Sequence, residues 1–208
     1  EVAQPQLLRH YYRLSQETMG NDVAVDFGLG TCTMKYSPKV NEHLVRMPEV
    51  QDLHPLQHED TVQGILEVLW RLEQMLCAIS GMDRFTLQPP SGSAAVYTNA
   101  SIVRAYHESR GEGLSAPEDR RRDEVITTIF SHPSNAAAAK VAGYKVITLY
   151  PDADGYPDLE ALRAAVGPRT AALMITNPED TGIFNPRIEE FVRVVHEAGG
   201  LCSYDQAN

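Results

Sequence analysis

The sequence predicts an open, doubly wound α/β sheet of mostly parallel strands, preceded by a helical N-terminal arm. From residue 84 onward, short apolar or β-branched runs alternate with stretches of helical periodicity. A single helix between two strands returns the chain to the same end of the sheet, so such strands are parallel. Residues 1–59 lack this rhythm, and we expect them to form an arm that lies against another part of the protein. The expected division is therefore an arm over 1–59 and a sheet domain over 60–208.

Each expected element has a local signal. A helix is expected over 6–18, a second short helix after Pro38, and a long amphipathic helix that Asp60 caps and Gly81 ends. The expected strands cover 84–87, 124–130, 145–150, 171–176 and 201–204. The helices between them run from the Gly/Ser turn at 91–93 to 107, from a Ser134 cap to 142, over 159–166 after an Asp158 cap, and from Asn185-Pro186 to 198.

Composition excludes several classes of protein. The chain has 208 residues, of which 43% are apolar and 22% charged, as in globular domains. Its net charge of −10 disfavours a broad surface for nucleic acid or anionic membrane. The basic run at 120–122 is flanked by acidic residues, so a solvated turn is favoured over a phosphate patch.

The cysteines indicate a reducing, cytoplasmic compartment. Cys32, Cys77 and Cys202 lie far apart and form neither a CxxC pair nor a zinc spacing, so no metal site is expected. No apolar run approaches the ~20 residues that span a bilayer, and no signal peptide is recognisable.

Polar residues follow four of the expected strands, where α/β sheets bind their ligands. The segments are Q-P-P-S-G-S-A-A (88–95), S-H-P-S-N (131–135), T-N-P-E-D-T-G (176–182) and D-Q-A-N (205–208). Each has an ordinary structural explanation. Ser91, Gly92 and Ser93 suit a helix cap, and His132 a hydrogen-bonded loop. Asn177-Pro178 is a common turn initiator, and Asp205 a possible cap.

Together, these segments favour a site for pyridoxal 5′-phosphate. The hydroxyls and free N–H groups of 91–93 suit a phosphate, and the ring of His132 could cover one cofactor face. Asp205 is the anionic partner that keeps the pyridine nitrogen protonated, so that the ring withdraws electrons from a substrate carbanion. A dinucleotide site competes with this interpretation, but the sequence has no G-x-G-x-x-G.

Several stretches also resemble a known family. They include L-L-R-H-Y-Y-R-L-S-Q (7–16), G-T-C-T-M-K-Y-S-P-K-V-N (30–41), D-L-H-P-L-Q (52–57), A-A-L-M-I-T-N-P (171–178) and Y-D-Q-A-N (204–208). In collinear order over essentially the whole chain, they resemble the P-protein of the glycine cleavage system, glycine dehydrogenase (decarboxylating). M-K-Y in the second stretch resembles subunit 2 of the split prokaryotic form.

The resemblance implies the large domain of a fold-type-I pyridoxal-phosphate enzyme. Such an enzyme decarboxylates glycine and passes the aminomethyl group to the lipoyl arm of H-protein, together with a partner subunit in a hetero- or homo-oligomer. By position, Ser91, Gly92 and Ser93 would hold the phosphate, and His132 and Ala207 would cover the two ring faces. Asp205 would pair with the pyridine nitrogen, Thr176 or Asn177 would lie near the ring edge, and the loop 31–36 would border the entrance. His132 and Asp205 would be the catalytic residues.

The chain departs from the family pattern at the cofactor loops. G-A-x-G-E in the family reads G-S-A-A-V here, which places Ala95 and Val96 at the positions of a glycine and an acid. H-G-[ST]-N-P reads H-P-S-N-A, with Pro133 for glycine, and D-G-A-N has Gln206 for glycine. Two alternatives therefore stay open: a divergent enzyme of the same fold that acts on another amino acid, and a non-catalytic partner subunit.

The covalent lysine of such enzymes has no counterpart in this chain. The four lysines are Lys35, Lys39, Lys140 and Lys145, in the arm, in an expected helix and at the start of an expected strand. In the family, the lysine lies further downstream, in an L-H-K stretch. We therefore expect the chain to be the N-terminal portion of a longer subunit, without the later strands, the small C-terminal domain or activity of its own.

Overall fold

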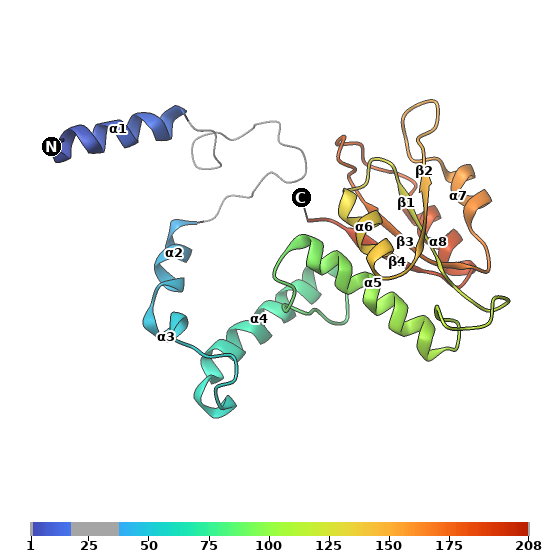
Figure 1. Cartoon of the computed structure of the whole chain (residues 1–208), viewed down its shortest axis with the longest axis horizontal. Coiled ribbons are helices and arrows are strands. Elements are labelled where there is room, and N and C mark those ends of the chain that lie inside the picture. Colours follow the sequence, from blue (N-terminus) through green and yellow to red (C-terminus); the bar gives the residue numbers. More distant parts are fainter. Residues whose placement is uncertain (1, 18–37, 208) are drawn as a thin grey trace. The chain divides into compact units, whose positions relative to one another are not determined.

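The computed structural model describes residues 2–17 and 38–207, which form two compact units, Glu1–Gln88 and Pro89–Asn208 (Figure 1). Among the described helices, none has the length and apolar character needed to cross a membrane. The domain boundary expected after residue 59 stays a prediction about the intact protein. The loop 31–36, Cys32 and Lys35 lie outside the described residues.

The N-terminal unit is helical in its described part. Its elements are α1 (Gln4–Glu17), α2 (Lys39–Val45), α3 (Pro48–Gln51), the 3-10 turn η2 (Glu59–Thr61) and α4 (Gln63–Ser80). The expected helices after Pro38 and before residue 18 are confirmed. Gly81 ends α4 with φ 73°, a left-handed conformation that glycine adopts without steric cost.

Two expectations for this unit are wrong. Asp60 lies in η2 and does not cap α4, which begins after Val62 without a side-chain cap. Residues 84–87 form no strand, and the Phe85 N–H donates to Glu73 Oε1 at 3.3 Å instead. Apolar character predicts where a strand can form, but a strand also needs a neighbouring strand as its hydrogen-bond partner.

The C-terminal unit contains a four-stranded sheet in the order β2-β1-β3-β4. Its strands are β1 (Glu124–Thr128), β2 (Lys145–Leu149), β3 (Thr170–Thr176) and β4 (Leu201–Asp205). All three pairings are parallel, which confirms the expectation from the single-helix crossovers.

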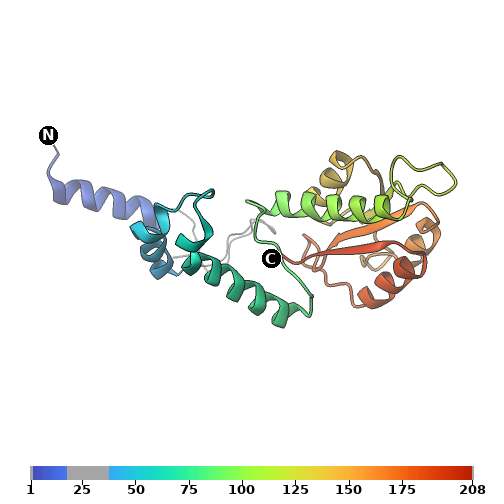
Figure 2. The ribbon, with the colours of Figure 1, turned by 90° about the horizontal axis from the view of Figure 1, so that it is seen from below.

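Helices cover both faces of this sheet, as a doubly wound fold requires (Figure 2). The helices α5 (Gly92–Ser109) and α6 (Pro133–Val141) pack on one face, and α7 (Leu159–Ala165) and α8 (Ile188–Glu197) on the other. The strand side chains alternate between two apolar cores: Val125 and Met174 face α5 and α6, whereas Ile126 and Leu173 face α7 and α8.

Helix starts in this unit agree with the sequence in part. Asp158 Oδ1 accepts from the N–H groups of Glu160 and Ala161, which confirms it as the cap of α7. The expected Ser134 cap of α6 is wrong, because His132 takes that position and Pro133 starts the helix. The helix α8 begins at Ile188 rather than after Asn185, because the Asn185 side chain accepts the Arg187 N–H in a turn before the helix.

Ion pairs hold the amino ends of the strands together. Asp123, before β1, accepts from Arg169, before β3, and lies 3.2 Å from Nζ of Lys145 on β2. Arg122 donates to Glu112 Oε2 and to the Thr170 carbonyl. Arg122, the last residue of the basic run at 120–122, therefore stabilises the fold by these two bonds.

Candidate functional site

The carboxyl edge of the sheet brings together His132, Thr176, Asn177 and Asp205. Thr176 and Asp205 are the last residues of β3 and β4, and the parallel register pairs them directly. His132 follows β1 across a short turn. Of the residues expected at this edge, these four occupy adjoining positions.

The Thr176 hydroxyl is the centre of this cluster. It accepts the His132 backbone N–H at 2.9 Å and the Asn135 side-chain amide at 3.0 Å. Because a hydroxyl carries one proton and both these partners are donors, that proton points to the remaining partner, Asp205 Oδ2, at 3.2 Å. Thr176 thus couples the backbone of His132 to the carboxylate of Asp205.

Asp205 is half-buried and is oriented by neutral donors. Oδ1 accepts the Ala207 N–H at 3.2 Å, and Oδ2 accepts from Thr176 and, at 3.4 Å, from Asn135. Within the described parts of the chain, no lysine, arginine or histidine forms an ion pair with it. The carboxylate is fixed in direction while its charge has no cationic partner there, which suits a protonated ring nitrogen.

Asn177 is held by hydrogen bonds to its neighbours. Its Nδ2 donates to the Tyr204 hydroxyl at 2.6 Å, and its Oδ1 accepts the Asn185 N–H at 2.8 Å. Its own N–H donates to the Asp205 carbonyl at 3.2 Å. Asn177 therefore fixes the loop after β3 against β4.

His132 is half-buried, and Ser134 contacts its ring. Nδ1 accepts the Ser134 N–H at 3.2 Å and lies 2.7 Å from Ser134 Oγ. A nitrogen that accepts an N–H bears no proton, so this geometry corresponds to the neutral tautomer protonated at Nε2. The cap bond thus sets the orientation of the imidazole plane.

The segment Ser91–Ser93 forms the start of α5. Ser91 Oγ accepts the Ala94 N–H at 3.2 Å, and the residues of this first turn are exposed. A Cβ at Gly92 would meet nothing within 4 Å. Figures 1 and 2 both show the first turn of α5 near the C-terminal end of β4, and Asn99 on α5 donates to Ser203 on β4 at 3.2 Å. The free N–H groups of an exposed helix start suit an anion.

Sequence reasoning did not single out Asn135 and Glu179 as site residues. Asn135 has no exposed surface, and its amide donates to the His132 carbonyl, Thr176 and Asp205, while its Oδ1 has no partner within the described structure. Their positions could have indicated a role in the site, because both residues lie in polar segments that directly follow strands.

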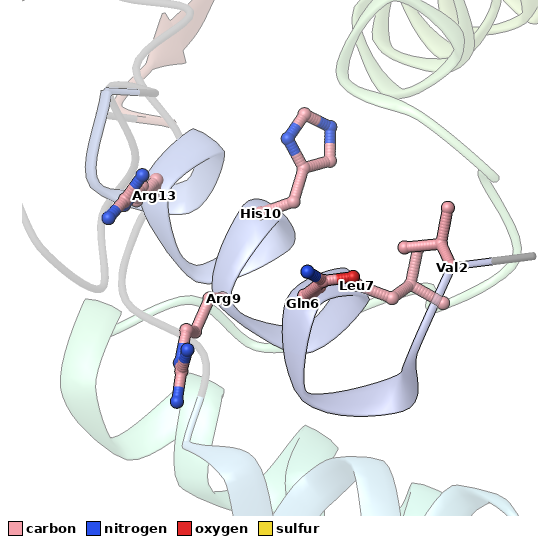
Figure 3. Close-up of a pocket in the computed structure, with 6 residues that line it drawn as sticks. All are labelled: Val2, Gln6, Leu7, Arg9, His10 and Arg13. Carbon is pink, nitrogen blue, oxygen red and sulfur yellow. The ribbon is translucent and has the colours of Figure 1, made fainter.

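The hollow drawn in Figure 3 lies on α1, in the N-terminal unit. The residues that line it are Val2, Gln6, Leu7, Arg9, His10 and Arg13. Their polar groups point in different directions around one helix and do not converge. In the described residues, no group of three metal-ligating side chains comes together.

The lysines of the sheet unit lie away from the carboxyl edge. Lys145 is the first residue of β2 and pairs with Asp123, whereas Lys140 is in the last turn of α6. Both positions belong to the amino edge, because strands and crossover helices run in opposite directions.

Comparison with known proteins bears on this site. The family model of aminotransferase class-V matches residues 113–208. "Probable glycine dehydrogenase (decarboxylating) subunit 2" of Pyrococcus abyssi is 48% identical over 208 residues, which cover 100% of this chain and 40% of that protein. The protein with the same description from Staphylococcus aureus is 45% identical, with 100% and 41% covered. The chain is similar to glycine dehydrogenase (decarboxylating) subunit 2 over its whole length. The expected resemblance is confirmed, and the chain spans about 40% of the length of these relatives.

Solved structures agree on the fold. A glycine decarboxylase (P-protein) of the glycine cleavage system, in inhibitor-bound form, has a TM-score of 0.70 at 20% identity, covering 98% of this chain and 43% of that one. A sphingosine-1-phosphate lyase from Burkholderia pseudomallei has a TM-score of 0.66 at 15% identity, with 99% and 47% covered. The chain thus shares the α/β fold of these fold-type-I pyridoxal-phosphate enzymes over the part that it covers, with an incomplete parallel sheet, as expected.

Proposed function

We propose that the chain is the N-terminal part of a pyridoxal-phosphate enzyme that decarboxylates glycine and transfers the aminomethyl group to the lipoyl group of H-protein. The observation that carries this proposal is the identity of 45–48% with glycine dehydrogenase subunit 2 along the entire chain. The cluster at the carboxyl edge supports it, because the chemistry of its donors and acceptors suits this cofactor.

Asp205 is the proposed partner of the pyridine nitrogen. Its two oxygens are held by Thr176, Asn135 and the Ala207 N–H, and no cation neutralises it within the described residues. When bound, pyridoxal phosphate supplies an electron-withdrawing ring that stabilises the negative charge left by loss of carbon dioxide. The function of Asp205 is to keep the proton on that nitrogen.

The other site residues would bind and orient the cofactor. Ser91, Gly92 and Ser93 would bind its phosphate at the start of α5, whose N–H groups and dipole favour an anion. The ring of His132, oriented by Ser134, would cover one face, and Ala207 the other. Thr176 and Asn177 would lie near the ring edge, although their hydrogen bonds indicate that they first of all orient their neighbours.

The substrates and partners follow from the same proposal. They are glycine, the lipoylated H-protein and a partner subunit in a hetero- or homo-oligomer, in the cytoplasm, without nucleic acid or membrane. Lys140 and Lys145 lie at the opposite edge, so neither would be the covalent lysine, which the resemblance places downstream of residue 208. Residues 1–208 alone would therefore be inactive.

The test uses the full-length protein with its partner subunit and H-protein. It should exchange the carbon of bicarbonate into glycine, and Asp205→Asn should lower this rate by about 10²–10³-fold, as loss of one preorganised electrostatic group does. Asp154→Asn, at an exposed turn, is the matched control and should leave the rate unchanged. Equal rates for Asp205→Asn and the control would contradict the role of Asp205.

The departures at Ala95, Val96, Pro133 and Gln206 favour a second candidate, an enzyme of the same fold that acts on another amino acid. A full-length protein that binds pyridoxal phosphate but exchanges no bicarbonate carbon into glycine would support this candidate. A full-length protein that binds no cofactor would instead support a non-catalytic partner subunit.

A further inference from the structure

A buried chain of hydrogen bonds lies directly beneath the proposed cofactor site. The Thr176 N–H donates to Ser131 Oγ at 3.0 Å, and Ser131 Oγ lies 2.7 Å from Thr128 Oγ1. Thr128 in turn donates to Glu179 Oε1. All four residues are buried, and Glu179, only 3% exposed, forms no ion pair among the described residues.

The order of the protons in this chain follows from the number each group carries. Thr128 has a single hydroxyl proton, which it gives to the Glu179 carboxylate. The Ser131 hydroxyl must therefore donate to Thr128, while it accepts the Thr176 N–H. Each hydroxyl then donates once and accepts once, and the ionised carboxylate is the final acceptor.

The same loop residues determine where His132 lies. The Asp180 N–H donates to the Phe130 carbonyl at 2.9 Å, and the His132 N–H donates to Thr176 Oγ1 at 2.9 Å. The turn between β1 and α6 is thus attached to the end of β3 and to the loop after it, by bonds on both sides of Ser131. Asp180, which forms the first of these bonds, is the residue directly after Glu179.

We propose that Glu179 is a positioning residue, whose ionised carboxylate orders the hydroxyl chain and thereby holds the turn that carries His132 against Thr176. The effect of Glu179 on cofactor binding rests on the proposed function. The ordering of the turn itself does not depend on that function.

Protonation of Glu179 would disrupt the sequence of donors and acceptors in this hydrogen-bond chain. When the proton is on Oε1, the oxygen that bonds Thr128, the carboxylic acid donates to Thr128, whose own proton then turns to Ser131. Ser131 would receive two donors and its own proton would lose its acceptor, which is costly in a buried site.

The surroundings of Glu179 raise the pH at which its carboxylate is protonated. Burial raises the pKa of Glu179, the bond from Thr128 opposes this shift, and Asp180 adds to it. The titratable groups on the neighbouring segments are Asp180 in the same loop, His132 on the β1–α6 turn, and Tyr204 and Asp205 on β4. The positioning is therefore present above the raised pKa and is lost as pH falls through it.

Amide hydrogen exchange of the full-length protein tests the ordering without requiring cofactor. Glu179→Gln should speed exchange at His132 about tenfold, with no change at Leu173 in the core of β3. In the wild type, protection at His132, corrected for intrinsic rates, should fall on acidification, whereas Glu179→Gln should show no such inflection. Glu189→Gln, at an exposed glutamate of α8, is the matched control.

A second pair of variants keeps the test decisive if Glu179→Gln folds poorly. Thr128→Val removes the hydroxyl and should reproduce the loss of protection, whereas Thr128→Ser should restore it. Unchanged protection in Glu179→Gln, or equal behaviour of Thr128→Val and Thr128→Ser, would overturn the proposal.

Cofactor titration separates this proposal from the proposed function. If the full-length protein binds pyridoxal phosphate, its affinity should fall about tenfold in Glu179→Gln and follow the same acidic inflection. Absence of cofactor binding in the wild type would refute the proposed function alone. Wild-type affinity and pH dependence in Glu179→Gln would refute the role of Glu179 in positioning the cofactor site.

Discussion

Replacement of Asp123 by asparagine should destabilise the sheet unit. Asp123 is 5% exposed and receives three hydrogen bonds from Arg169, at 2.9, 2.7 and 2.6 Å. Asparagine preserves the shape but removes the charge and one of the two acceptors of this bidentate pair. Lys145 contributes little, because its side chain is 65% exposed. Charge-assisted bonds to a buried group are worth about 1.5–3 kcal/mol, so we expect a loss of about 2 kcal/mol in the free energy of unfolding.

The pKa of Asp123 determines how its contribution to stability depends on pH. Burial alone would raise the pKa of Asp123, but the hydrogen bonds and charges of Arg169 and Lys145 outweigh it and leave the pKa lowered. The contribution of Asp123 is therefore fully present above its unfolded pKa, about 3.9, and is lost as pH falls through the lower folded value.

Urea unfolding of the 208-residue chain at several pH values provides the assay. The gap in stability between wild type and Asp123→Asn should be constant from neutral pH to about 4 and should close below it. Asp154→Asn, at an exposed position, should stay within about 0.5 kcal/mol of wild type. An unchanged midpoint for Asp123→Asn, or a gap that persists in strong acid, would refute the reasoning.

Three further predictions follow from other parts of the fold. Gly81→Ala should cost about 1 kcal/mol, measured by thermal unfolding, because φ is 73° there; Gly64→Ala inside α4, where a Cβ meets nothing within 4 Å, should cost nothing. Phe191→Ala should cost about 3–5 kcal/mol in urea unfolding, since its side chain is fully buried, and a loss below 1 kcal/mol would contradict its place in the core. Ser91→Asp should preserve stability, because aspartate also caps helices, but should weaken pyridoxal-phosphate binding by charge repulsion; unchanged affinity in a titration would remove Ser91 from the phosphate site.

Local patterns in the sequence determined most of the elements and their parallel arrangement. The alternation of apolar runs and helical stretches marked all four observed strands, and Asp158 and Gly81 act as the expected helix ends. These features depend on residues that lie within a few positions of each other, so the sequence shows them directly. The loops at the carboxyl edge were also evident, because the direction of each strand follows from its crossover.

Only the tertiary structure decided which side chains bond to one another at that edge. Thr176 meets Asp205 because the register of β3 and β4 pairs them, and Glu179 meets Thr128 because its loop folds back over β1. The segment 84–87 alternates polar and apolar residues as a strand does, yet it forms no strand. Hydrogen-bond partners that are dozens of residues apart are selected by register and packing. The sequence therefore indicated the segments that reach the edge, whereas the fold determined which of their side chains, such as those of Thr176 and Glu179, form hydrogen bonds with one another.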